Sequence, residues 1–206
     1  VPLAEVAKYS PGVARTFSAA DQVLAVAQYW LSDVKVVADV YSPERFAADP
    51  VYARHIGQLN VLTYLIRHRD SNLGNFLLGK AEVGARVFSI DHGVDFASDE
   101  SDRGEVWKDM RVNRLPADTV ERLRHVTPQL LADRLGVLAQ WRLESRSYVP
   151  VANGKNLSEN RGVRRAGSDL QMGLTKSEIL AVHRLLTKLL ERVDRGEITM
   201  VPAAGA

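Results

Sequence analysis

The chain has 206 residues, of which 46% are hydrophobic and 25% are charged, and its formal net charge is +2. This length and composition suffice for one domain with a proper hydrophobic core, and the balanced charge favours neither a nucleic-acid partner nor a membrane surface. No apolar run approaches the length of a transmembrane helix. The absence of cysteine excludes disulfides and thiolate metal sites.

The chain begins at Val1 rather than at Met, which indicates a processed, trimmed or partial chain whose targeting segment is out of view. We expect a cytoplasmic location. Secretion stays open because the native N-terminus is not visible.

The first elements are ambiguous. Residues 1–17 have an irregular pattern, with Pro2, Pro11 and Gly12. Residues 18–31 have apolar side chains at helical spacing and predict a helix, but they also fit a strand that leads into residues 34–40.

A helix is predicted from Asp49-Pro50 to the end of the apolar run, with Asp49 as the N-cap and Pro50 at the first helical position. We expect His55 to be half-buried on this helix. The apolar residues at helical spacing form its expected buried face: Val51, Ile56, Leu59, Leu62, Leu65 and Ile66.

The stretch that follows the helix carries the most informative pattern. It places Asp70 and Asn75 five residues apart, directly before the apolar strand 76–78. A second strand, 87–90, leads into Asp91, and the loop between the strands contains two glycines. In an antiparallel hairpin the start of one strand lies beside the end of the other, so Asn75 and Asp91 should meet at one edge.

These residue types suit phosphoryl transfer. The reaction needs a carboxylate near the attacking hydroxyl and hard oxygen ligands for the magnesium ion that bridges the nucleotide phosphates. Asp70 fits the first role, while the Asn75 amide oxygen and the Asp91 carboxylate fit the second.

The segment His68-Arg69-Asp70-x-x-x-x-Asn75 resembles the catalytic loop of protein kinases, and Asp91-His92-Gly93 resembles their metal-binding triplet in an atypical form. The Asp-His-Gly form is more similar to the atypical kinases, which include the phosphatidylinositol 3- and 4-kinase-like enzymes and the secretory-pathway kinase-like proteins. The resemblance implies ATP and Mg²⁺ (or Mn²⁺) as cofactors, Asp70 as the catalytic residue, and Asn75 and Asp91 as metal ligands.

The resemblance also implies the fold. We expect an α+β, mostly helical chain that forms a protein-kinase-like large lobe with a short catalytic hairpin. Neither a glycine-rich phosphate loop nor a Val-Ala-x-Lys strand precedes the hairpin, so the small lobe should be reduced or missing. In the family a hinge strand lines the adenine pocket, which assigns nucleotide contacts to Gln28 and Trp30; the alternative is an ordinary amphipathic core element.

Two other functions stay open. A pseudokinase or interaction module would keep the large-lobe fold without chemistry. A metal-dependent hydrolase would use His68, Asp70, Asp91 and His92 as a cluster, because imidazole and carboxylate suit a divalent transition metal. That grouping leaves Asn75 without a role and lacks a third histidine on a helix.

An acidic stretch between Asp95 and Asp109 predicts a solvated loop, or a charged border of the substrate entrance. Trp107 is expected to be a packing anchor. Further on, Pro116 and Asp118 open a helix, and Thr127-Pro128 restarts it with an apolar stripe that continues through Leu138 and Trp141.

The end of the chain should be structural. Residues 146–174 predict a long polar loop, in which Arg161, Arg164 and Arg165 either clamp phosphate or keep the loop soluble. The capping box Thr175-x-x-Glu178 starts a last helix, which Gly196 closes.

The expected organisation is a single kinase-like domain over 1–206. Residues 1–45 are the remnant of the small lobe and hinge, 46–145 the catalytic core, 146–174 the polar loop and 175–196 the C-terminal helix. The expected function is ATP-dependent transfer of a phosphoryl group to a hydroxyl of a protein, lipid or small molecule.

Overall fold

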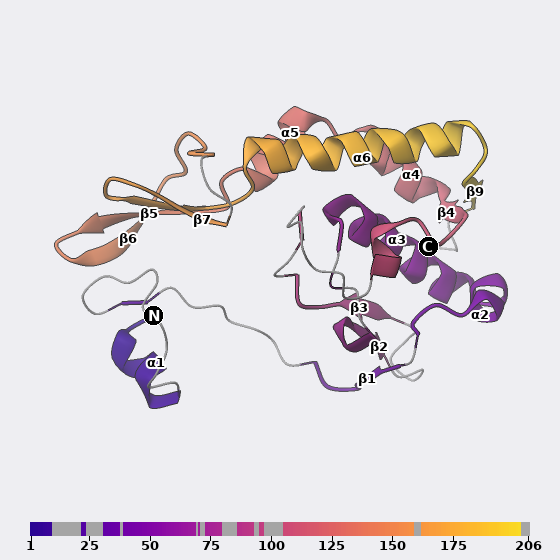
Figure 1. Cartoon of the computed structure of the whole chain (residues 1–206), viewed down its shortest axis with the longest axis horizontal. Helices are drawn as coiled ribbons and strands as arrows, with labels where there is room; N and C mark the ends of the chain where they lie inside the picture. Colours follow the sequence, from indigo (N-terminus) through magenta and orange to yellow (C-terminus); the bar gives the residue numbers. More distant parts are fainter. Residues whose placement is uncertain are drawn as a thin grey trace. The chain divides into compact units, whose positions relative to one another are not determined.

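The structure is a computed structural model that describes residues 1–9, 22–23, 31–37, 39–68, 70, 73–79, 86–92, 95–96, 105–158 and 162–202. Its contacts divide the chain into two compact units, where the sequence predicted one domain. The first unit comprises Val1–Trp30 and Gln129–Ile179, and the second comprises Leu31–Pro128 and Leu180–Ala206. Figure 1 follows the described elements along the sequence.

The second unit begins with a short strand and two helices, and it contains the predicted hairpin. Its elements up to residue 128 are β1 (Val34–Val36), α2 (Pro43–Ala48), α3 (Pro50–Ile66), η1 (Leu73–Asn75), β2 (Phe76–Gly79), β3 (Val87–Ser89), η3 (Glu105–Lys108), β4 (Arg114–Pro116) and α4 (Ala117–Arg124). Most of α6 (Lys176–Asp194) and β9 (Thr199–Val201) complete it.

Helix α3 begins where the sequence predicted. The Asp49 carboxylate accepts hydrogen bonds from the backbone N–H groups of Val51 and Tyr52, at 3.1 and 3.0 Å, and thereby caps the helix. The predicted buried face is only partly right, because Val51 and Leu62 are 52% and 46% exposed. The helix ends at Ile66, and its C-cap Arg67 has a left-handed backbone that turns the chain toward His68.

The antiparallel hairpin is confirmed. Strands β2 and β3 pair with Phe76 opposite Ser89 and Leu78 opposite Val87. Strand β1 pairs antiparallel with the other edge of β2, which gives a three-stranded sheet. Residues 34–36 thus form a strand, while most of residues 18–31, for which helix and strand were both open, lie outside the described part of the chain.

The hydrophobic core of the second unit joins the hairpin to helices from both ends of its sequence. Phe76 and Trp107 are buried and their ring centroids lie 5.2 Å apart, so Trp107 is a packing residue as predicted. Leu189 and Val193 of α6 belong to the same core. Strand β9 pairs in parallel with β4, and Thr199 bonds the Asn113 carbonyl through both its backbone N–H and its hydroxyl.

The first unit contains the largest correction to the sequence analysis. Residues 146–174 do not form a polar loop, and the apolar stripe does not continue as a helix through Trp141. Instead, four antiparallel strands form a sheet in the order β6-β5-β8-β7, drawn in orange in Figure 1. The strands are β5 (Ala139–Glu144), β6 (Ser147–Val151), β7 (Val163–Ala166) and β8 (Asp169–Met172).

Arg164, expected in a soluble loop, is a buried residue of β7. It is 1% exposed, and its guanidinium donates to the Gly136 carbonyl at 2.7 Å. Arg165 lies on the same strand and bonds the Tyr148 hydroxyl, while Arg161 lies outside the described residues. The proposed phosphate clamp of three arginines is therefore not formed at the surface.

Helices α4, α5 and α6 agree with their sequence signals, whereas α1 forms within residues 1–17, where the sequence pattern is irregular and predicted no helix. Helix α1 spans Leu3–Tyr9, α5 spans Pro128–Leu135, and α4 and α5 begin near Pro116 and Thr127 as predicted. Helix α6 starts at the capping box and ends before Gly196, whose φ is 74°. Among the helices in the described ranges, none is long and apolar enough to cross a membrane.

Candidate functional site

Asp70 and Asn75 pair directly in the turn between α3 and β2. The Asn75 side-chain amide donates to the Asp70 backbone carbonyl at 2.6 Å and to the Asp70 carboxylate at 3.1 Å. Asn75 is 8% exposed and belongs to η1, immediately before β2. The spacing predicted from the sequence therefore brings these two side chains into contact.

The hairpin also brings Asp91 to the same edge as Asn75. The Ile90 N–H donates to the Asn75 carbonyl at 2.9 Å, and Asp91 is the next residue in the chain. Asp91 has a left-handed backbone with φ of 58°, which turns the chain sharply after β3, and its side chain is exposed. Two oxygen-bearing side chains thus flank one solvent-accessible end of the sheet.

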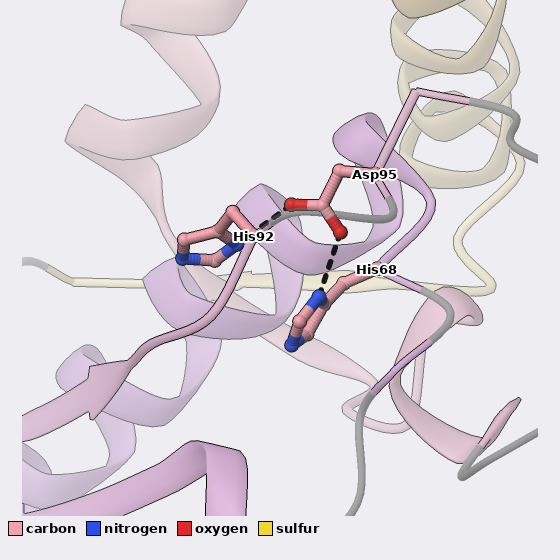
Figure 2. A group of neighbouring side chains, drawn as sticks. All are labelled: His68, His92 and Asp95. Carbon is pink, nitrogen blue, oxygen red and sulfur yellow. Dashed lines mark hydrogen bonds and ion pairs between the residues drawn. The ribbon is translucent and has the colours of Figure 1, made fainter. Parts of the chain in front are cut away.

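A second group of side chains, formed by His68, His92 and Asp95, links the segment that follows α3 to the segment that follows β3. His68 is fully buried, and its Nδ1 lies 2.7 Å from one carboxylate oxygen of Asp95. His92 Nδ1 lies 2.7 Å from the other oxygen of Asp95, and its Nε2 lies 3.2 Å from the Ser89 carbonyl. Figure 2 shows both imidazoles directed at the one carboxylate.

The protonation of this group is set by burial and by its own hydrogen bonds. Burial alone would raise the pKa of Asp95, but the hydrogen bonds from His68 and His92 together hold it below its ordinary value. The hydrogen bond to Asp95 raises the pKa of His92 against the opposing effect of burial, and the nearby Asp91 carboxylate adds to the increase. The arrangement therefore favours an ionised Asp95 between the two rings.

Asp95 corrects one expectation. It does not belong to a solvated acidic loop, because its side chain is fully buried. The ring of His68 bonds this carboxylate, while the His68 backbone N–H donates to the Thr63 carbonyl at 2.8 Å. The signal that would have identified Asp95 is the spacing His92-x-x-Asp95, which suits a local side-chain contact.

The hydrolase grouping is only partly assembled. The rings of His68 and His92 lie 4.9 Å apart, as that grouping requires, but the carboxylate between them is Asp95 rather than Asp70 or Asp91. Donor atoms of His68, His92 and Asp95 all lie within 4.8 Å of one another. His68 Nε2 is buried and has no hydrogen-bond partner in the described part of the chain.

Several residues singled out from the sequence lie outside the described residues. They include Gln28 and Trp30, for which nucleotide contacts were predicted, together with Arg69 and Gly93. His55, which is described, is half-buried on α3 as predicted.

No family model matches the chain, and no match was found among curated proteins or solved structures.

Proposed function

We propose that this chain is an ATP-dependent phosphotransferase of the atypical kinase-like type. The observation that carries the proposal is the convergence of Asp70, Asn75 and Asp91 at one end of the β2–β3 hairpin. Phosphoryl transfer needs one carboxylate for the acceptor hydroxyl and separate oxygen ligands for a hard cation. A scaffold without chemistry has no physical need for all three groups in this arrangement.

The hydrogen bonds assign a role to each group. Asn75 uses its amide nitrogen toward Asp70, and its Oδ1 is the atom that would offer a neutral oxygen to Mg²⁺ or Mn²⁺. Asp91 offers an exposed, charged oxygen on the neighbouring strand end. When bound, the metal would neutralise charge on the nucleotide phosphates.

Asp70 is the residue suited to the acceptor. Its carboxylate accepts a hydrogen bond from Asn75, which fixes the orientation of the carboxylate relative to the metal ligand. In that position it orients an incoming hydroxyl and accepts its proton.

Asp95 acts through other residues and is a positioning residue. It holds His68, two residues before Asp70, and His92, the residue after Asp91. One buried carboxylate therefore fixes the two functional loops relative to each other. Such precision matters because misplacing a catalytic group by about 1 Å costs on the order of a hundredfold in rate.

The metal-dependent hydrolase is a second candidate, favoured by the closely spaced donors of His68, His92 and Asp95. Against it, both Nδ1 atoms are already engaged by the Asp95 carboxylate, so a metal there would replace two hydrogen bonds. The phosphotransferase uses the exposed Asp91 and gives Asn75 a role.

Thermal unfolding with ATP and Mg²⁺ tests the proposal. Ligand at about a hundred times its dissociation constant should stabilise the wild-type chain by about 2.7 kcal/mol. Asp91→Ala should remove the Mg²⁺-dependent part of this stabilisation, because the charged metal ligand is lost. The matched control is Asp133→Ala, which removes an exposed aspartate of α5.

Equal metal-dependent stabilisation in Asp91→Ala and the control would show that Asp91 is not a ligand. An unchanged wild-type midpoint with ATP and Mg²⁺ would instead favour the pseudokinase. Stabilisation by Zn²⁺ alone that is lost in His92→Ala would favour the hydrolase.

A further inference from the structure

A cavity of about 460 Å³ lies in the second unit, between the end of α3 and one face of α6. Arg67 lines one side, and Arg184, Lys188 and Glu191 line the other, with Leu185 among the residues between them. All lining residues belong to the second unit. The volume is in the range of pockets that hold small ligands, about 300–1,000 Å³.

The cavity carries excess positive charge. Arg67, Arg184 and Lys188 make no ion pair and no side-chain hydrogen bond with any residue that the structure describes. Glu191 is the one acidic residue in the lining, and it also interacts electrostatically with Arg195 outside it.

Most other arginines of the second unit are paired, which makes the cavity distinctive. Arg54 forms a two-pronged pair with Asp118, and Arg111 forms another with Asp39. The charges of these two arginines are therefore neutralised by carboxylates of the same chain. In the described part of the chain, no acidic side chain forms such a pair with Arg67, Arg184 or Lys188 of the cavity.

The local geometry keeps these charges together. Arg184 and Lys188 are four residues apart on α6, a spacing that places like charges side by side and is unfavourable without an intervening anion. Arg67 has a left-handed backbone at the end of α3, and its N–H donates to the Tyr64 carbonyl at 3.2 Å. The three cations therefore lie on helix α6 and at the C-cap of helix α3, which are both regular secondary structure.

The cavity adjoins the proposed catalytic loop. Arg67 precedes Asp70 by three residues, and three residues of extended chain span at most about 11 Å. The Cα atoms of Arg67 and Asp70 are therefore no further apart than this, so the cavity lining includes a residue next to the segment that carries Asp70.

We propose that this cavity recognises the acceptor of the phosphotransferase, and that the acceptor is a hydroxyl compound carrying a phosphate group. The inference rests on the proposed function. Arginine forms paired hydrogen bonds with phosphate, and lysine adds a point charge, so the set Arg67, Arg184 and Lys188 fits a phosphate dianion. Leu185 offers an apolar surface to the body of the same molecule.

The test is an NMR titration of the full chain with glycerol 3-phosphate, inorganic phosphate and glycerol. Glycerol 3-phosphate should cause saturable shifts at the amides of Arg67, Arg184 and Lys188, and glycerol should not. The double variant Arg184→Gln/Lys188→Gln should bind glycerol 3-phosphate at least about tenfold more weakly, because two charge-assisted contacts are lost.

The control removes the same charge elsewhere, in Arg122→Gln/Arg134→Gln, and should bind as the wild type does. Equal binding by the two double variants, or the absence of saturable shifts, would overturn the proposal. Binding of inorganic phosphate without glycerol 3-phosphate would also overturn it, since the cavity would then take free phosphate rather than an acceptor.

The wild-type response to ATP and Mg²⁺ separates this proposal from the one on which it rests. An anion site without nucleotide stabilisation would refute the phosphotransferase and leave a phosphate-binding cavity. Nucleotide stabilisation without anion binding would refute the acceptor assignment alone.

Discussion

Asp95 is the single side chain on which the geometry of the candidate site depends most. Its two carboxylate oxygens each hold one imidazole, and those imidazoles flank the positions of Asp70 and Asp91 in the sequence. A substitution there should therefore lower stability and disturb the site together.

We expect Asp95→Ala to lower the free energy of unfolding by about 3 kcal/mol, because it removes the acceptor of two hydrogen bonds and leaves the buried His68 Nδ1 without a partner. Denaturant unfolding of the variant beside Asp133→Ala measures the difference. The exposed control should change stability by less than about 0.5 kcal/mol. A similar small change in both variants would contradict the bridging role of Asp95.

His55 predicts a pH dependence of stability. Burial, together with the charges of Arg86 and Arg54, lowers the pKa of His55 below 6.5 in the folded chain. The folded state therefore binds fewer protons than the unfolded state as the pH falls below that value, and stability is lost on acidification through the folded pKa.

His55→Gln should remove this loss. The stability of the wild type relative to the variant should decrease between about pH 8 and pH 5, as measured by urea unfolding, because the unfolded His55 titrates near pH 6.5. A constant difference across this range would show that His55 does not titrate differently on folding.

Sequence spacing predicted that Asp70 and Asn75 would lie close together, because they are only five residues apart. It also predicted that Asp91 would approach Asn75, because a hairpin brings the start of one strand beside the end of the next. Asp95 was missed for the opposite reason. It begins a run of acidic residues, and composition in such a run indicates solvent exposure, whereas burial of one member depends on the tertiary position of His68.

At the scale of elements, the sequence predicted the start of helix α6 most clearly. The Thr175 hydroxyl accepts from the Glu178 N–H at 3.2 Å, and the Glu178 carboxylate accepts from the Thr175 N–H at 2.7 Å. This reciprocal pair is a capping box, and it was recognisable from four residues of sequence.

Thr175→Ala should lower the free energy of unfolding by about 1 kcal/mol through loss of the cap. Thr175→Ser keeps the hydroxyl and should retain most of that stability. Chemical denaturation of the two variants gives the comparison, and equal losses would assign the effect to the Thr175 methyl group rather than to the cap.

The β5–β6 hairpin of the first unit was missed because its turn has atypical residues. The two residues between β5 and β6 are Ser145 and Arg146, which both have positive φ, of 46° and 74°. Such turns usually contain Asn-Gly or Gly, so no hairpin signal was present at these two residues. Arg164 added to the error, since a charged residue seldom occupies a buried strand position.

At the scale of the whole molecule, the sequence predicted one domain and the contacts form two compact units. Each unit combines two segments that are distant in the sequence. Composition and periodicity report on neighbouring residues, so they identify helices but not which distant segments share a core. The proximity of Asp70, Asn75 and Asp91 was predictable because all three residues fall within one segment of the second unit.

The pairing of β4 with β9 has a consequence for how the chain acquires its structure. Thr199 meets Asn113 across a separation of 86 residues, and the nearby Ile198 is 1% exposed. At synthesis rates of about 5–20 residues per second, Asn113 is synthesised about 4–17 seconds before Thr199. The second unit therefore becomes complete only after the strands of the first unit have been synthesised.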